Sequence, residues 1–145
     1  MNIQMKNIIL TLCQVGEVFT NGKLWLCNVF VGDAIYLYDG RNFTSGNDHY
    51  YDPSQIYMGK SFLRKRKSYK DVEAGDIVVF GTSHVEIITS VQNNWILDDG
   101  FCSIGAGRGG SGESGRDNMG KVKCDGFFSG ITRELDNSDN SYYSL

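Results

Sequence analysis

Cys27 and His84 are the two residues of this chain whose types and surroundings best fit nucleophilic chemistry. Cys27 lies in the apolar run Leu24-Trp25-Leu26-Cys27-Asn28-Val29-Phe30, and His84 opens Val85-Glu86-Ile87-Ile88. A cysteine is a useful nucleophile only as the thiolate, and the unpaired N–H groups and dipole of a helix N-terminus favour that negative charge. An imidazole on a neighbouring strand can take the thiol proton and return it to a leaving amine. We therefore predict a cysteine–histidine pair that meets in space although its members are far apart in sequence.

Hydrophobic patterning predicts helices first and strands later. Apolar residues at helical spacing predict a helix over about residues 2–15 and a more buried one over about 26–39, with Cys27 in its first turn and a stop at Asp39-Gly40. Polar residues dominate 41–70, where we expect loops and one short helix starting near Asp52-Pro53-Ser54. β-Branched and aromatic runs predict antiparallel strands at 77–80, 85–91 and 95–97, with a last strand around 121–133. The tail, 135–145, is expected to fray.

Length and charge predict one compact domain, 1–145, that is not built to hold a polyanion. The chain has 145 residues, 41% of them hydrophobic, a single proline and a net charge of -3. This balance argues against nucleic acid as the main partner, and we expect a monomer. The exception is the basic block Arg64-Lys65-Arg66-Lys67. It fits either a solvated surface or a contact with an anionic partner.

Cysteine usage and the N-terminal residues bear on the compartment. Residues 1–14 do not have the pattern of a cleavable secretion signal, and no segment approaches the roughly 18 apolar residues that span a bilayer. We therefore expect synthesis in the cytoplasm and no insertion into a membrane. If Cys27 is free, as a nucleophile must be, Cys13, Cys102 and Cys124 can form at most one disulfide. A bond between Cys13 and Cys124 would tie the first helix to a late strand.

Two segments of the chain resemble a known group of enzymes. The stretch Val72-Glu73-Ala74-Gly75-Asp76-Ile77-Val78-Val79-Phe80, followed by Ser83-His84-Val85-Glu86-Ile87-Ile88, resembles the xGDIVxF…HVxIV pattern of the CHAP and NlpC/P60 families of papain-like cysteine amidases. The segment Cys27-Asn28-Val29-Phe30-Val31 is similar to their nucleophile helix, and the resemblance covers about residues 20–100. It implies a small α+β fold in which N-terminal helices, carrying Cys27, pack on an antiparallel sheet that carries His84.

The same resemblance implies a reaction and a setting. It implies hydrolysis of amide bonds in peptidoglycan peptides through a Cys27 thioester, with a hydrolytic water activated by His84 and no cofactor or metal. The Cys27 backbone N–H is the natural oxyanion donor, and Asn21 has the spacing of the papain-type oxyanion glutamine, although a surface turn residue is the alternative. Cys102-Ser103-Ile104-Gly105 and the lack of a signal also resemble amidase effectors of type VI secretion systems. That likeness implies action in the periplasm or at the wall of a target cell, and an immunity protein as a partner.

Two other functions stay open beside this one. The chain could be a papain-like hydrolase or acyltransferase that acts on a different amide or thioester. It could also be a non-catalytic module that keeps the fold in order to bind cell-wall peptide.

The third member of the site is open as well. The families place a polar residue on the strand after the histidine strand, where it holds the imidazole tautomer. If Gln92-Asn93-Asn94 is a hairpin loop, His84 faces Cys102 on that next strand. Asp98 shares the same face but lies roughly 13 Å away along the strand, and Asp99 would need a bulge to turn inward. Cys102 and Asp98 therefore rank nearly equal and Asp99 follows, with a backbone or water partner as the alternative.

Overall fold

The structure is a computed structural model that describes residues 27–46, 49–92, 100–106, 122–124 and 133–145. The helical elements of these residues are α2 (Cys27–Asp39), α3 (Pro53–Tyr57) and the 3-10 turn η1 (Tyr69–Asp71). The strands are β1 (Thr44–Ser45), β2 (His49–Tyr50), β3 (Arg64–Lys65), β4 (Ile77–Phe80), β5 (His84–Gln92), β6 (Gly100–Ile104) and β7 (Asn140–Ser144).

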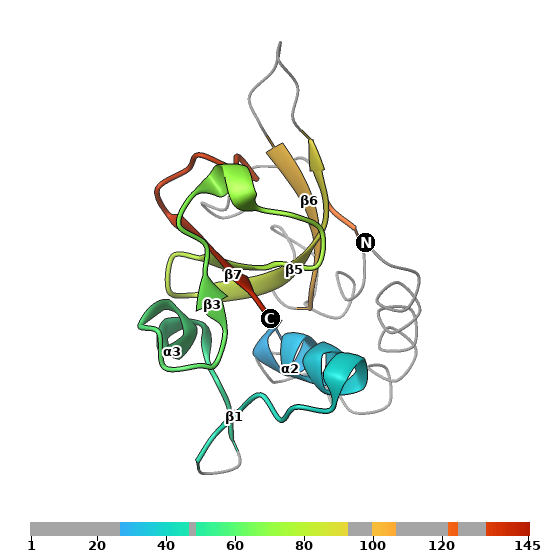
Figure 1. The fold of residues 1–145 in the computed structure, drawn as a ribbon, viewed down its shortest axis with the longest axis vertical. Coiled ribbons are helices and arrows are strands. Elements are labelled where there is room, and N and C mark those ends of the chain that lie inside the picture. The colour runs from blue at the N-terminus through green and yellow to red at the C-terminus, as the bar shows by residue number, and fades with distance from the viewer. Residues whose placement is uncertain (1–26, 47–48, 93–99, 107–121, 125–132) are drawn as a thin grey trace, which may run out of the picture.

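An antiparallel sheet with the strand order β3-β7-β4-β5-β6 forms the centre of the described structure (Figure 1). Strand β4 pairs with β5 on one side and with β7 on the other, so that Val78 lies opposite Glu86 and opposite Tyr142. Strands β1 and β2 form a separate two-stranded sheet. A few helices on an antiparallel sheet confirm the predicted α+β class.

Both faces of the sheet are covered by apolar side chains. All four residues of β4 are buried, and they alternate between two clusters. Ile77 and Val79 pack into the cluster that includes the buried face of α2, whereas Val78 and Phe80 pack into a cluster on the other face. Burial on both faces explains why this strand is a continuous apolar run.

Helix α2 is described from Cys27 and ends at Asp39. The stop predicted at Asp39-Gly40 is confirmed: Gly40 has a φ of 78° and its N–H donates to the Tyr36 carbonyl at 2.8 Å, which is how a left-handed glycine caps a helix. The helix is buried in its earlier turns and exposed in its last turn, where Tyr36 is 53% and Leu37 46% exposed. The buried part of α2 is therefore the part that begins at Cys27.

The expectation that the tail frays is wrong. Asn140–Ser144 forms β7, which lies between β3 and β4, and Tyr143 is only 2% exposed. Tyrosine favours strands and buries a large ring. These two tyrosines, Tyr142 and Tyr143, outweigh the polar residues around them.

The other predicted elements have mixed outcomes. The strands predicted at 77–80 and 85–91 are confirmed as β4 and β5, and the short helix near Asp52-Pro53-Ser54 is α3. Strand β6 was not predicted at Gly100–Ile104. The helix at 2–15 and the strand at 95–97 lie outside the described residues. Of the strand at 121–133, the structure shows an isolated bridge between Lys123 and Ser103. No described helix is long and apolar enough to cross a membrane.

Candidate active site

Cys27 is the first described residue of α2 and is buried, with 2% of its surface exposed. The first four N–H groups of a helix have no partner within the helix. The sequence predicts Cys27 in the first turn of its helix, where such donors and the positive end of the helix dipole favour a negative charge. Of the cysteines that the structure describes, Cys27 alone is free of a disulfide.

His84 is held at the start of β5 by a tight turn. Gly81 adopts a φ of 58°, in the left-handed region that glycine enters at little cost, and its N–H donates to the Asp139 carbonyl at 2.7 Å. The turn places His84 directly opposite Phe80, and the two rings stack with their centroids 5.8 Å apart. Helix α2 also packs against β5, the strand that His84 opens.

The structure brings Cys27 and His84 together. Burial of the imidazole lowers the pKa of His84, but its hydrogen bonds with Cys27 and Glu86 outweigh that effect and raise the pKa to about 9. At neutral pH His84 is therefore an imidazolium.

Glu86 is the third member of this cluster, and the sequence analysis missed it. Its Oε1 lies 2.9 Å from Nε2 of His84. Burial raises the pKa of Glu86, but the hydrogen bond and charge of His84 and the charge of Arg133 lower it to about 2. Side chains two residues apart on a strand share one face. That period of two in His84-Val85-Glu86 was the signal that could have found it.

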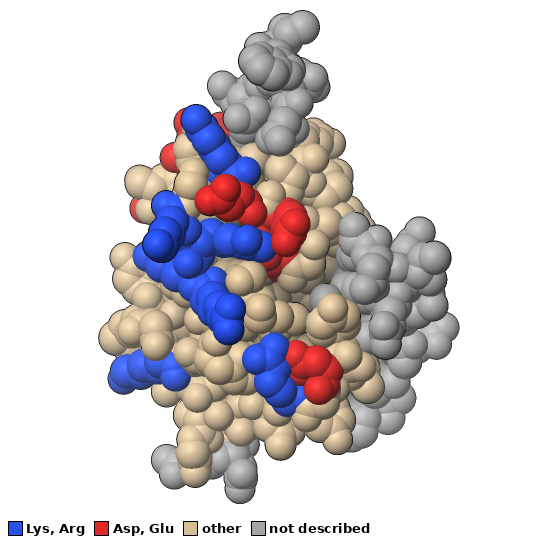
Figure 2. Space-filling view, viewed as in Figure 1, with Lys and Arg blue, Asp and Glu red and all other residues tan. Residues whose placement is uncertain are grey.

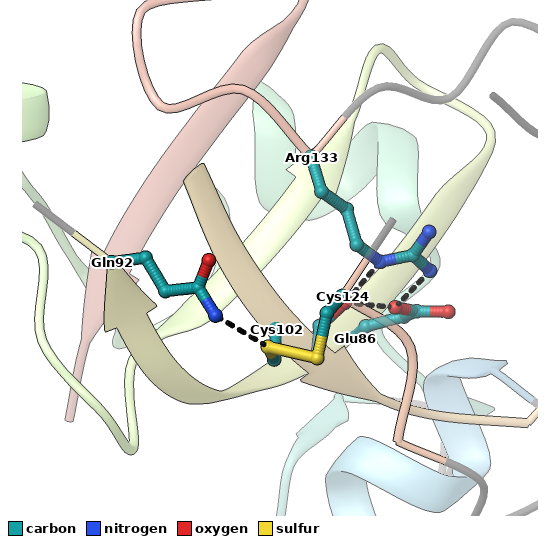
Figure 3. The surroundings of a disulfide bond; sticks show 6 residues. Glu86, Gln92, Cys102, Cys124 and Arg133 are labelled. Carbon is teal, nitrogen blue, oxygen red and sulfur yellow. Dashed lines mark hydrogen bonds and ion pairs between the residues drawn. A yellow bond between two sulfur atoms is a disulfide. The ribbon is translucent and has the colours of Figure 1, made fainter. Parts of the chain in front are cut away.

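A second layer of contacts fixes the Glu86 carboxylate. Ser103 donates its hydroxyl to Oε2 of Glu86 at 2.5 Å, and Arg133 donates an Nη2 N–H to the same oxygen at 3.0 Å. Arg133 also donates from Nε to the Ser103 oxygen at 2.8 Å. Arg133 points toward the Glu86 carboxylate in Figure 3. The buried polar groups thus form a chain from His84 through Glu86 to Ser103 and Arg133.

Cys102 is not the residue that orients His84, because its sulfur is bonded to Cys124. The expected register is also wrong: Cys102 pairs with Ser90, with a shift between Ile88 and Ser90. The observed register buries Phe101 and Ile104 in the two apolar clusters, and burial of one face is what sets a strand register.

The structure does not test the other candidates for the third residue, and it changes the expected cysteine pairing. Asp98 and Asp99 lie outside the described residues, as do Asn21 and Cys13. The suggested bond between Cys13 and Cys124 is replaced by the Cys102–Cys124 disulfide (Figure 3). Ser103 and Lys123 exchange two backbone hydrogen bonds, so their neighbours Cys102 and Cys124 form a cross-strand pair of the closely spaced kind.

The basic block is partly neutralised within the molecule. Arg66 binds the buried Asp76 with two nitrogens, each 2.9 Å from a carboxylate oxygen, and also binds Glu73 at 2.9 Å. Figure 2 shows Asp and Glu side chains among the Lys and Arg side chains on the face that carries β3 and η1. Arg66 therefore has a structural role. Arg64 and Lys65 of β3, in contrast, are exposed.

No protein-family model, curated protein or solved structure matches this chain.

Proposed function

We propose that this chain is a papain-like cysteine amidase that hydrolyses amide bonds in peptidoglycan peptides. The observation that carries the proposal is the cluster of Cys27, His84 and Glu86, in which the buried thiol of Cys27 on α2 forms a hydrogen bond with an imidazole that a buried carboxylate orients. The resemblance of the segments around Cys27 and His84 to cell-wall amidases supports this class of substrate.

The first half of the proposed reaction forms a thioester. The Cys27 thiolate attacks the amide carbonyl carbon, and the carbonyl oxygen becomes an oxyanion. In this proposal the backbone N–H of Cys27 donates to that oxyanion. His84, as the imidazolium, gives its proton to the nitrogen of the breaking C–N bond, and the amine leaves.

The second half releases the acid product. His84, now neutral, takes a proton from a water that attacks the thioester carbonyl. The C–S bond then breaks and the thiolate and imidazolium pair forms again. Glu86 stabilises the imidazolium and holds the ring orientation at both stages, so it acts through His84 and not on the substrate.

The setting is part of the same proposal. A peptidoglycan substrate places the activity in the periplasm or at the wall of a target cell, and an immunity protein would protect the producing cell. The Cys102–Cys124 disulfide supports an oxidising compartment, because structural disulfides persist in the periplasm and are rare in the cytosol.

Digestion of purified sacculi followed by mass analysis of the released muropeptides tests the proposal. We expect the native chain to release amide-cleaved fragments and Cys27→Ala to release none while keeping the native circular dichroism spectrum. Ser83→Ala, which removes a hydroxyl from the turn before His84, is the matched control and should keep its activity.

The alternatives give different results in the same assay. Equal product from the native chain and from Cys27→Ala would rule out the proposed mechanism. Binding of the native chain to sacculi without any cleavage would favour a non-catalytic module. Inactivity on sacculi together with turnover of a generic peptide amide, lost in Cys27→Ala, would move the proposal to a different amide substrate.

A further inference from the structure

Different groups contact the two carboxylate oxygens of Glu86. Oε1 faces His84, whereas Oε2 accepts from Ser103 on β6 and from Arg133, which lies beyond it in the sequence. The phenyl ring of Phe80 lies below the guanidinium, with Arg133 Cζ 5.8 Å from the ring centroid. Each carboxylate oxygen therefore has its own task.

This buried ion pair is not the most stable way to fill this part of the core. Arg133 is 7% exposed, and its Nη1 is buried without a hydrogen-bond partner among the described residues. A buried, unpaired N–H is destabilising, and replacing a buried ion pair by apolar residues is often neutral or stabilising. The buried guanidinium therefore lowers the stability of the fold, which indicates that it has a functional role at the Glu86 carboxylate.

Gly105 shows that the packing around Glu86 is adapted to it. A Cβ on Gly105 would lie 2.7 Å from Cγ of Glu86, closer than side chains pack. The carboxylate side chain thus occupies the space that a larger residue would fill at the end of β6.

We propose that Arg133 and Ser103 are positioning residues that clamp Oε2 of Glu86, so that the carboxylate stays ionised and presents Oε1 to His84. The proposal deepens the proposed function and rests on it for its catalytic meaning. The charged or titratable groups that contact Glu86 among the described residues are His84 and Arg133, and Cys27 enters the network through His84. A cation and a hydroxyl donor on Oε2 both favour the charged form.

Titration of the Glu86 side-chain carboxyl by carbon-13 NMR tests the clamp without any substrate. The signal is assigned by its loss in Glu86→Gln. In the native chain burial raises the pKa of Glu86, but His84, Arg133 and Ser103 lower it to about 2. We expect Arg133→Met to raise that pKa by about one unit or more and Ser103→Ala to raise it by less. Arg133→Lys keeps the charge and should restore most of the native value.

Controls separate the clamp from a general loss of stability. Arg66→Met removes another partly buried arginine, whose partners are Asp76 and Glu73, and should leave the Glu86 titration unchanged. Ser141→Ala removes a buried serine of β7 and should do the same. If Arg133→Met does not fold, Ser103→Ala decides the question alone. A Glu86 titration that neither variant moves would overturn the proposal.

The pH profile of amide hydrolysis gives the second readout. Arg133→Met should move the acid limb of the profile to higher pH, and this shift should vanish when Glu86→Gln is already present, because the two residues act as one unit. A shift that persists in the double variant would overturn the proposal. If neither the native chain nor any variant cleaves amides, the proposed function fails. The NMR titration still shows whether Arg133 and Ser103 clamp Glu86.

Discussion

Glu86 lies on the same strand as the histidine that it contacts, two residues further along. Its Oε1 is 2.9 Å from His84 Nε2, so one strand supplies both the base and the group that orients it. Their mutual placement depends on the geometry of a single strand and not on the register between two strands. We expect the His84–Glu86 contact to survive shifts of β6 that would separate a partner on that strand.

Removal of the Glu86 charge should change the titration of His84. In Glu86→Gln, burial of the ring still lowers the pKa of His84, whereas the carboxylate that raises it is gone. We expect the pKa to fall from about 9 by about one unit or more. Proton NMR of the histidine rings measures it, with His49→Gln to assign the only other histidine.

Glu73→Gln is the control for this titration. The Glu73 side chain is 73% exposed and pairs with Arg66, so its loss should leave His84 unchanged. The same His84 titration in Glu86→Gln as in the native chain would mean that the carboxylate does not support the imidazolium.

The sequence predicted two of the three clustered residues. Cys27 and His84 are recognisable because each opens a predicted element and has a suitable side chain. Glu86 was missed because the family pattern places the orienting group on the following strand, where Cys102 and Asp98 offered polar atoms. Arg133 carries no local signal, since only the tertiary fold brings it to Glu86.

At the scale of elements, the close approach of β5 and β6 at Gly105 should be sensitive to a single methyl group. Gly105→Ala would push a Cβ to 2.7 Å from Glu86 Cγ, and the clamped carboxylate would have to move. We expect kcat on sacculi to fall about 10²-fold, the scale of a small misplacement in a catalytic cluster. Gly46→Ala, where a Cβ meets nothing within 4 Å, should keep its kcat. Equal activity of both variants would contradict this account.

The Cys102–Cys124 disulfide should stabilise the outer edge of β6. Its two residues are 22 positions apart, and closing a loop of this length contributes about 3 kcal/mol to the free energy of unfolding. Cys102→Ala/Cys124→Ala should lose that amount in urea denaturation. Native protein in reductant should lose a similar amount, and reductant should not affect the double variant. Equal stability of all four samples would show that the disulfide contributes nothing.

Elements with a regular pattern were predictable and the others were not. The run Ile77–Phe80 and the stop of α2 at Asp39-Gly40 follow local rules. Strand β7 does not, because its Asn and Ser residues are typical of a tail and only pairing with β3 and β4 makes it a strand. The bounds of strand β6 were not predicted either, because Gly100 and Gly105 flank its apolar residues.

At the scale of the whole molecule, the His84–Glu86 pair links folding to pH. The pKa of His84 is raised from 6.5 to about 9, so its contribution to stability is complete below pH 6.5 and is lost as the pH rises through 9. The pKa of Glu86 is lowered from 4.5 to about 2, so its contribution is complete above pH 4.5 and is lost as the pH falls through 2. Both contributions are complete between pH 4.5 and 6.5.

Urea denaturation across this range measures the linkage. The stability difference between the native chain and His84→Gln/Glu86→Gln should be most favourable to the native chain between pH 4.5 and 6.5. It should shrink on both sides of that window. A difference that is constant from acid to alkaline pH would exclude the pair as the source of the pH dependence.

The Cys102–Cys124 bond also determines whether the chain would stay in one piece after cleavage by a protease. A cut of any peptide bond between these two residues would divide the chain into a front piece with Cys27, His84 and Glu86 and a back piece with Arg133 and β7. The disulfide would keep the two pieces covalently joined, so that Arg133 and β7 would stay attached to the piece that carries Cys27, His84 and Glu86. Nicked protein would then run as two fragments on a gel only after reduction.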